Sequence, residues 1–96
     1  MSKGYWIAKV NISDSDAFKE YASRAKLAIE KHGGKYIVRG GNFSLLEGKH
    51  DFERNVIVEF DSVKKARECF NSKEYQEAKS YRNGKADFNA IVIEGY

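Results

Sequence analysis

Two arginines and three aromatic residues are the side chains of this sequence best suited to chemistry. Arg39 lies on an apolar segment directly before two glycines, which permit the close approach of a ligand. Its guanidinium can hold a carboxylate through two parallel hydrogen bonds. The alternative is an ion pair with a glutamate such as Glu47 or Glu59 at an interface. Arg39 is therefore a candidate ligand-binding residue.

The other candidates are Trp6, Tyr21, Tyr75 and Arg82. Tyr75 and Arg82 are seven residues apart and share a face of a predicted helix, while Tyr21 lies on the core side of an earlier helix. With Trp6 as a floor, they would line a cleft that suits a small aromatic or carboxylated molecule. Phenol and arginine groups assist proton transfer or stabilise an enolate or oxyanion. The alternative is a set of core aromatic residues whose polar tips are satisfied internally.

The histidines and the cysteine predict no metal site and no cofactor. His32 falls in the last turn of a predicted helix and His50 in a turn, and their spacing matches no metal-binding motif. A haem-ligating histidine is the alternative. Cys69 has no second cysteine nearby and is predicted to be a small buried apolar residue rather than a nucleophile.

The length and composition are typical of one small domain, over residues 1–96. Of the 96 residues, 42% are apolar, which is enough for one core. The 17 basic and 14 acidic residues are interspersed, so the net charge of +3 predicts a solvated surface rather than a basic stripe. No apolar run approaches the length of a membrane span. A single cysteine and the absence of a signal-peptide core predict a cytoplasmic protein.

Nucleic-acid binding is disfavoured by the same pattern. The predicted third strand, residues 54–60, lacks the exposed aromatic residues of an RNA-recognition strand. Asp51, Glu53 and Arg54 form a charged turn that is typical of solvated surface. We therefore expect no nucleic-acid partner.

Hydrophobic periodicity predicts alternating strands and helices. Apolar residues that alternate at period two predict strands over 5–11, 35–39, 54–60 and 88–94, with an extended segment over 43–47 beyond a bulge at Gly40–Gly41. A capping segment at 13–16 and a glycine pair at 33–34 delimit the first helix. Ser62 and Ser72 cap two further helical segments, which end at Asn83–Gly84. The resulting βαββαβ order predicts an α+β, ferredoxin-like fold: a four-stranded antiparallel sheet with the helices on one face.

The second face of this sheet is left without a cover. The helix-covered face would hold Trp6, Ala8, Val10, Val56, Val58 and Phe60. The bare face would hold Tyr5, Ile7, Lys9, Ile57 and Glu59, with Ile91, Ile93 and either Ile37 or Val38. Six apolar side chains at on the order of 100 Å² each give about 600 Å², the upper end of what a monomer exposes.

A homodimer packed sheet against sheet is the simplest way to cover this area. Lys9 and Glu59 would pair as opposite charges if adjacent strands align them. The alternative is a monomer whose second sheet face stays partly exposed to solvent.

Short motifs along the whole chain resemble one bacterial protein family. They are Gly4-Tyr5-Trp6-Ile7-Ala8, Gly33-Gly34, Val38-Arg39-Gly40-Gly41, Leu46-Glu47-Gly48, Val58-Glu59-Phe60, Asn71-Ser72-Lys73-Glu74-Tyr75-Gln76, Arg82 and Val92-Ile93-Glu94-Gly95. In this order they resemble the family known only as domain of unknown function 1330. Ser15 and Lys73 stand where such sequences often have proline after the helix cap.

The resemblance implies a dimeric α+β barrel, in which two sheets pack face to face. It implies no particular reaction. The wider superfamily includes cofactor-free monooxygenases, haem-degrading enzymes and small isomerases, so any activity would be expected to be monooxygenase-like or isomerase-like without a cofactor. A non-catalytic structural or protein-interaction module is the alternative.

Overall fold

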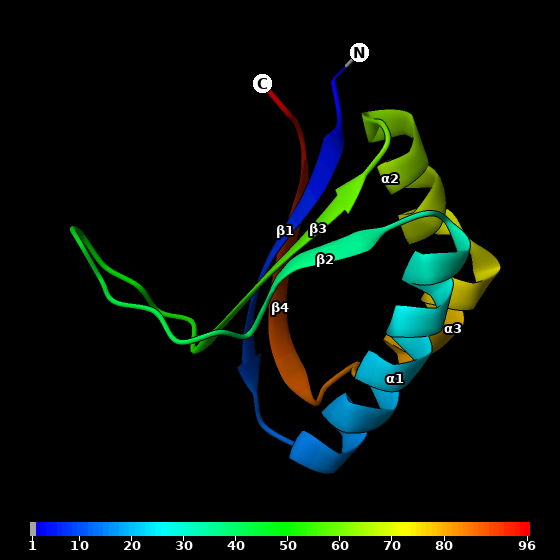
Figure 1. The fold of residues 1–96 in the computed structure, drawn as a ribbon. Coiled ribbons are helices and arrows are strands. Elements are labelled where there is room, and N and C mark those ends of the chain that lie inside the picture. Colours follow the sequence, from blue (N-terminus) through cyan, green and yellow to red (C-terminus); the bar gives the residue numbers. More distant parts are fainter. Residues whose placement is uncertain (1) are drawn as a thin grey trace.

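A single antiparallel sheet with three helices on one face makes up the fold, as Figure 1 shows. The structure is a computed structural model that describes residues 2–96. Its elements are β1 (Gly4–Ile12), α1 (Ser15–Lys31), β2 (Lys35–Arg39), β3 (Arg54–Phe60), α2 (Val63–Asn71), α3 (Lys73–Ser80) and β4 (Ala86–Glu94). The strand order is β2-β3-β1-β4, and all neighbouring strands are antiparallel. The predicted ferredoxin-like βαββαβ fold is therefore confirmed.

Each helix begins with a polar N-cap residue at the position that the sequence predicts. The Asp14 carboxylate accepts a hydrogen bond from the backbone N–H of Ala17 at 3.0 Å, and the Ser62 hydroxyl accepts one from Lys65 at 3.1 Å. Ser72 separates α2 from α3 and caps the second of them. These bonds satisfy amide groups that have no partner within the helix. The helical layer is thus divided at the predicted positions.

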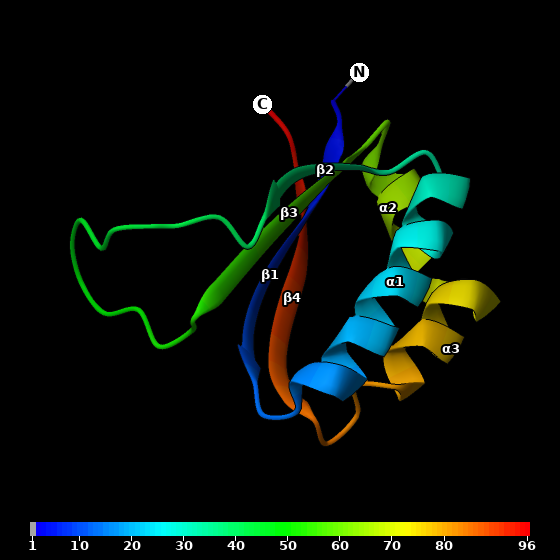
Figure 2. The same ribbon diagram turned by 60° about the horizontal axis from the view of Figure 1, so that its bottom comes forward.

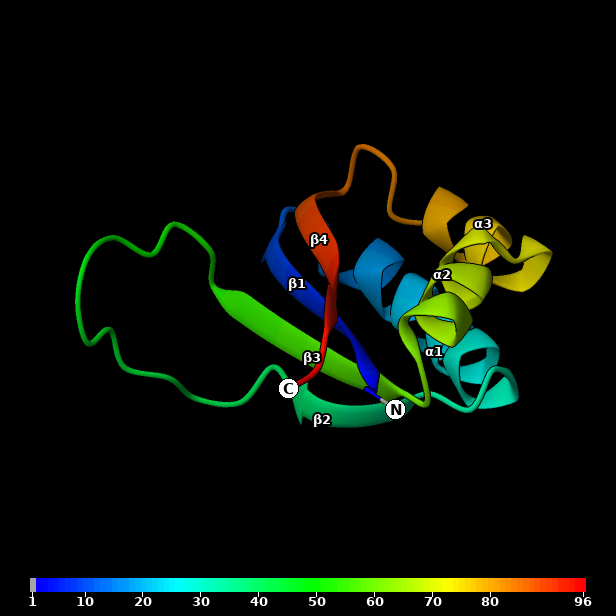
Figure 3. The same ribbon diagram turned by 90° about the horizontal axis from the view of Figure 1, so that it is seen from above.

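The strand register places the predicted core residues on the helix-covered face. Trp6 lies opposite Val58 on one side and Val92 on the other, and Ala8 lies between Val56 and Ala90 in the next row. Directly opposed residues of an antiparallel pair point to the same face. The hydrophobic core lies between the covered face and the helices. Figure 3 shows these two layers from above.

The predicted dimer-face residues lie on the opposite, uncovered face. Ile7 stands between Ile57 and Ile91, which is 56% exposed. Tyr5 is flanked by Glu59 and Ile93 in the next row. Helices cover the other side only (Figure 1), so no part of residues 2–96 covers this apolar face.

The predicted pairing of Lys9 with Glu59 is wrong. The register puts Lys9 opposite Asn55, while Glu59 lies opposite Tyr5 at the other end of the strand pair. Glu59 instead accepts a hydrogen bond from the Tyr5 hydroxyl at 3.0 Å and lies 3.7 Å from the Lys3 ammonium group. The Glu59 charge is therefore paired within one chain.

The second strand differs from prediction in where it is irregular. The register shifts between Tyr36 and Val38, so the bulge lies at Ile37 and not at Gly40–Gly41. Residues 43–47 form no strand. Residues 41–53, here called the arm, project away from the helices in Figures 1 and 2. The arm exposes three large apolar side chains, Phe43, Leu45 and Leu46, the last of them fully.

Asn11 of β1 holds the base of the arm. Its side-chain amide donates a hydrogen bond to the Asp51 carbonyl at 2.7 Å, and its side-chain oxygen accepts one from the Glu53 backbone N–H at 2.8 Å. Elsewhere the arm lacks regular structure. In the described part of the chain, no helix combines the length and apolar character needed to cross a bilayer.

Candidate functional site

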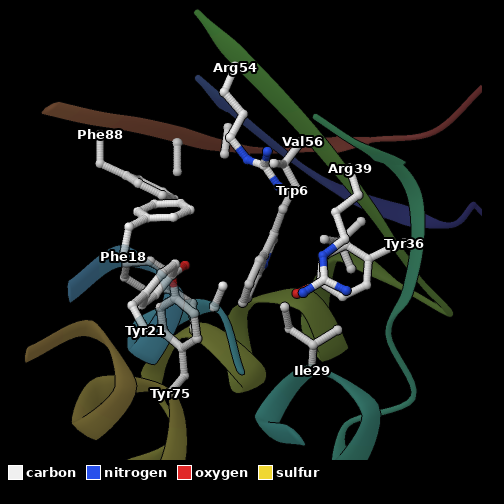
Figure 4. A pocket seen from close by; sticks show the side chains of 15 residues that line it. Trp6, Phe18, Tyr21, Ile29, Tyr36, Arg39, Arg54, Val56, Tyr75 and Phe88 are labelled. Atoms are coloured by element: carbon white, nitrogen blue, oxygen red, sulfur yellow. The ribbon is translucent and has the colours of Figure 1, made fainter. Parts of the chain in front are cut away.

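A pocket opens between the covered sheet face and the helices, and Figure 4 shows its lining. Fifteen residues from β1–β4, α1, α2 and α3 contribute to it, and most of them are apolar or aromatic. The space open to the centre of a water-sized sphere is about 40 Å³, enough for roughly three water molecules. The enclosed part of the pocket is therefore small.

Trp6 lies in the middle of the pocket lining in Figure 4 and also belongs to the hydrophobic core. Its indole N–H donates a hydrogen bond to the Ala66 carbonyl of α2 at 2.9 Å, which fixes the ring plane. The rings of Phe60 and Tyr75 lie with their centroids 5.0 Å from it. In Figure 4, the Tyr21–Tyr75 pair lies on one side of Trp6 and Arg39 on the other.

Tyr21 and Tyr75 meet at the buried end of the pocket. Tyr21 comes from α1 and Tyr75 from α3, and their hydroxyl oxygens are 2.7 Å apart in a hydrogen bond. Burial raises the pKa of Tyr21 well above its usual value, and the nearby Tyr75 hydroxyl adds to this rise. Tyr21 is consequently protonated at any physiological pH, so it offers a hydrogen-bond donor.

Arg82 lies behind this pair and does not line the pocket. The predicted shared helix face with Tyr75 is wrong in detail, because α3 ends at Ser80 and Arg82 follows in the turn before β4. A guanidinium N–H nevertheless reaches the Tyr75 hydroxyl at 3.4 Å. The Arg82 carbon Cζ lies 3.7 Å from the centroid of the Phe88 ring, a cation–π contact.

Arg39 stands at the more exposed end of the pocket. It lies opposite Val56 on the covered face, and its guanidinium packs over the Tyr36 ring at 4.5 Å. Within residues 2–96, it makes no ion pair with Glu47 or Glu59. Arg39 therefore lies on the face away from the bare sheet surface.

Arg54 is a pocket residue that the sequence analysis missed. The sequence correctly places it at the start of the third strand but predicts solvated surface for it, whereas Arg54 lines the pocket opposite Val10 of β1. Its guanidinium packs against Gly40, where a side-chain Cβ would collide with it, and its Nε atom is buried without a partner. The signal was present, because Arg54 is two residues before Val56 and so shares its face.

The histidines and the cysteine lie outside this pocket. A ring nitrogen of His32 bonds to the Ala28 carbonyl at 2.9 Å, and His50 in the arm packs against Phe43. Burial raises the pKa of the Cys69 thiol to about 12, so the thiol is protonated and a poor nucleophile. Among residues 2–96, no group of three or more histidine, cysteine or acidic residues is placed to hold a metal ion.

Comparisons with known proteins agree with this fold. A model of the family described as a domain of unknown function, DUF1330, matches residues 3–96. No protein with a curated description matches the sequence.

Three solved structures show the same architecture. A protein of unknown function from Rhodopseudomonas palustris superposes with a TM-score of 0.79 at 21% identity, covering 99% of this chain and 83% of that one. SnoaB, a cofactor-independent oxygenase from Streptomyces nogalater, superposes with a TM-score of 0.63 at 6% identity, covering 100% and 95%. A dimeric ferredoxin-like protein of unknown function from Thermobifida fusca has a TM-score of 0.57 at 16% identity, covering 97% and 91%. At these identities the likeness concerns the fold alone.

Proposed function

This chain belongs to the DUF1330 family, and we propose that it binds a small aromatic carboxylate in the pocket between its sheet and helices. The observation that carries this proposal is the pairing of two guanidiniums, those of Arg39 and Arg54, with an aromatic pocket that contains no carboxylate among its lining residues. A guanidinium is a donor only, and its strongest partners are carboxylates and phosphates.

The two parts of the pocket suit the two parts of such a ligand. Arg39 is exposed and Arg54 half-buried, so an anionic head beside them would stay close to solvent. Trp6, Tyr21 and Tyr75 are buried and offer ring faces and edges to a flat apolar group. Because the enclosed space is small, we expect a one-ring acid whose head remains in the open mouth.

Phenylacetate is a suitable first probe for this site. We expect it to raise the melting temperature and to bind measurably in isothermal titration calorimetry. Arg39→Ala and Arg54→Ala should each weaken binding by about 30-fold, because each removes a charge-assisted hydrogen bond that is worth roughly 2 kcal/mol. Arg24→Ala is the matched control, since Arg24 lies on α1 in a surface ion pair with Glu20. Absence of binding, or equal loss in all three variants, would refute the proposal.

We also propose that the protein acts as a homodimer, with the uncovered sheet faces packed together. The bare face carries Ile7, Ile57 and the half-exposed Ile91 and Ile93. The arm projects away from the helices, and its exposed Leu46 would add apolar area against a second copy. A stable interface needs about 800 Å² from each partner, which the sheet face alone approaches and the arm completes. The neighbour from Thermobifida fusca is described as dimeric, which supports a dimer of this chain.

The proposal stops at binding because the similarity to an oxygenase concerns the fold alone. A location in the cytoplasm likewise stays a prediction from the sequence.

A further inference from the structure

Arg82 is the one charged residue that is buried among residues 2–96, with 6% of its surface exposed. No carboxylate lies within ion-pair distance of it in this part of the chain. Its Nε atom is buried without a hydrogen-bond partner, and the one side-chain bond of its guanidinium goes to the Tyr75 hydroxyl. Burying a charge without a carboxylate partner is costly, and the cation–π contact with Phe88 offsets only part of that cost.

Arg82, Tyr21 and Tyr75 form one cluster, and a count of its hydrogen-bond donors and acceptors shows what it lacks. Arg82 donates only, so the Tyr75 oxygen is an acceptor toward it. Tyr21 and Tyr75 have two phenolic protons, and one of them is used in the bond between the two hydroxyls. The other proton has no acceptor among these three side chains. Since both tyrosines line the pocket, an acceptor that enters the pocket can receive it.

The position of the cluster relative to Arg39 and Arg54 gives the pocket two polar ends. The arginine end is the more exposed, and the tyrosine end is buried. Figure 4 shows Trp6 between the Tyr21–Tyr75 pair and Arg39. A flat ring packed beside Trp6 can therefore direct one polar group to each end.

We propose that Tyr21, Tyr75 and Arg82 form an oxyanion-binding end of the pocket, and that the ligand is an aryl acid with a second, anionic oxygen such as an ionised phenol or enol. This inference rests on the proposed function and specifies its ligand. One tyrosine donates its free proton to the oxyanion. Arg82 is a positioning residue that acts through Tyr75, and its buried charge compensates the charge of the ligand, because electrostatic attraction is strong in a site without water.

The raised pKa of Tyr21 is consistent with this arrangement. The tyrosine keeps its proton and donates a hydrogen bond, while the ligand carries the negative charge. The remaining ionisable side chains of the pocket lining are Tyr36, Arg39 and Arg54, so no carboxylate there opposes an anion.

The test uses a probe whose ionisation is visible. 4-Hydroxy-3-nitrophenylacetate has a carboxylate for the arginine end and a phenol whose absorption spectrum changes when it ionises. We expect binding to lower the pKa of the probe's phenol by at least about one unit, which corresponds to at least tenfold tighter binding of the phenolate than of the phenol. 3-Nitrophenylacetate, which lacks the hydroxyl, reports on the rest of the pocket.

Two matched pairs of variants separate the roles of the residues. Arg82→Met should abolish the change in the probe's pKa while leaving the affinity for 3-nitrophenylacetate within a factor of about three, and Arg82→Lys should restore part of the change. Tyr75→Phe should reduce the change as well, because it removes the hydrogen bond through which Arg82 acts. Tyr21→Phe should keep most of it, because Tyr75 then has its own proton free. Tyr75→Phe keeps the test decisive if Arg82→Met does not fold.

The outcomes distinguish this inference from the proposed function. If 3-nitrophenylacetate binds but the bound phenol ionises as it does in water, the oxyanion end is refuted and the carboxylate pocket stands. If the change in pKa survives Arg82→Met and disappears in Arg39→Ala, the oxyanion lies at the arginine end and the inference is again refuted. If neither probe binds, the proposed function fails, and this inference fails with it.

Discussion

Gly4→Ala should lower the free energy of unfolding by about 3 kcal/mol, the upper end of the usual cost of overpacking a core. Gly4 is buried at the start of β1, where it packs against the beginning of α2. A Cβ atom there would lie 2.6 Å from the carbonyl carbon and oxygen of Ser62 and from Cα of Val63. All three are backbone atoms, so neither a change of rotamer nor a small shift of a flexible side chain relieves the contact.

Gly41→Ala is the control for this effect. Gly41 lies at the start of the arm, a Cβ atom there meets nothing within 4 Å, and its φ angle lies outside the left-handed region. Urea denaturation of both variants at equal protein concentration compares them. The expected result is a clearly lower midpoint for Gly4→Ala and a change within about 0.5 kcal/mol for Gly41→Ala. Equal stability of the two variants would show that β1 and α2 separate without cost.

Ile7→Glu should convert the proposed dimer into a monomer. Ile7 lies in the centre of the uncovered face between Ile57 and Ile91, so a two-fold axis through this face would bring two new carboxylates into an apolar interface. Burying unpaired charges there costs several kcal/mol, and at 1.4 kcal/mol per factor of ten we expect dissociation to become easier on the order of a thousandfold. Sedimentation at low micromolar concentration would then give the 11.0 kDa mass of one chain.

Leu27→Glu provides the matched comparison. Leu27 is 69% exposed on α1, in the helical layer rather than on the bare sheet face. This variant should sediment like the original protein, at twice the mass of one chain. If the original protein itself sediments as a monomer at this concentration, the dimer proposal is wrong. If Leu27→Glu dissociates the dimer and Ile7→Glu does not, the interface lies on the helices.

The sequence predicts the fold well because its local signals agree with one another. Alternation in residues 5–11 and 54–60 determines which face each side chain joins, and the caps at Ser62 and Ser72 lie where the helices begin. The covered face and the bare face follow from these two patterns alone. They depend only on spacing along each strand, which the chain carries in its sequence.

The features that were missed depend on how distant segments are aligned. The register of β1 against β3 decides that Lys9 faces Asn55 instead of Glu59, and nothing local in either strand specifies it. The end of α3 at Ser80 moves Arg82 from the predicted helix face to a position behind Tyr75. Arg54 was missed for another reason, since its charged neighbours obscured an alternation that continues through it.

The position of Trp6 gives this protein an informative intrinsic fluorescence signal. It is the single tryptophan of the chain, so all indole fluorescence comes from one position. The ring borders the pocket and also a second cavity beneath α2, which Ala66 and Phe70 help to line. The wavelength and intensity of its emission therefore report on the environment where sheet, helices and ligand would meet. A native protein without any attached dye can be observed as it fills its pocket or loses its fold.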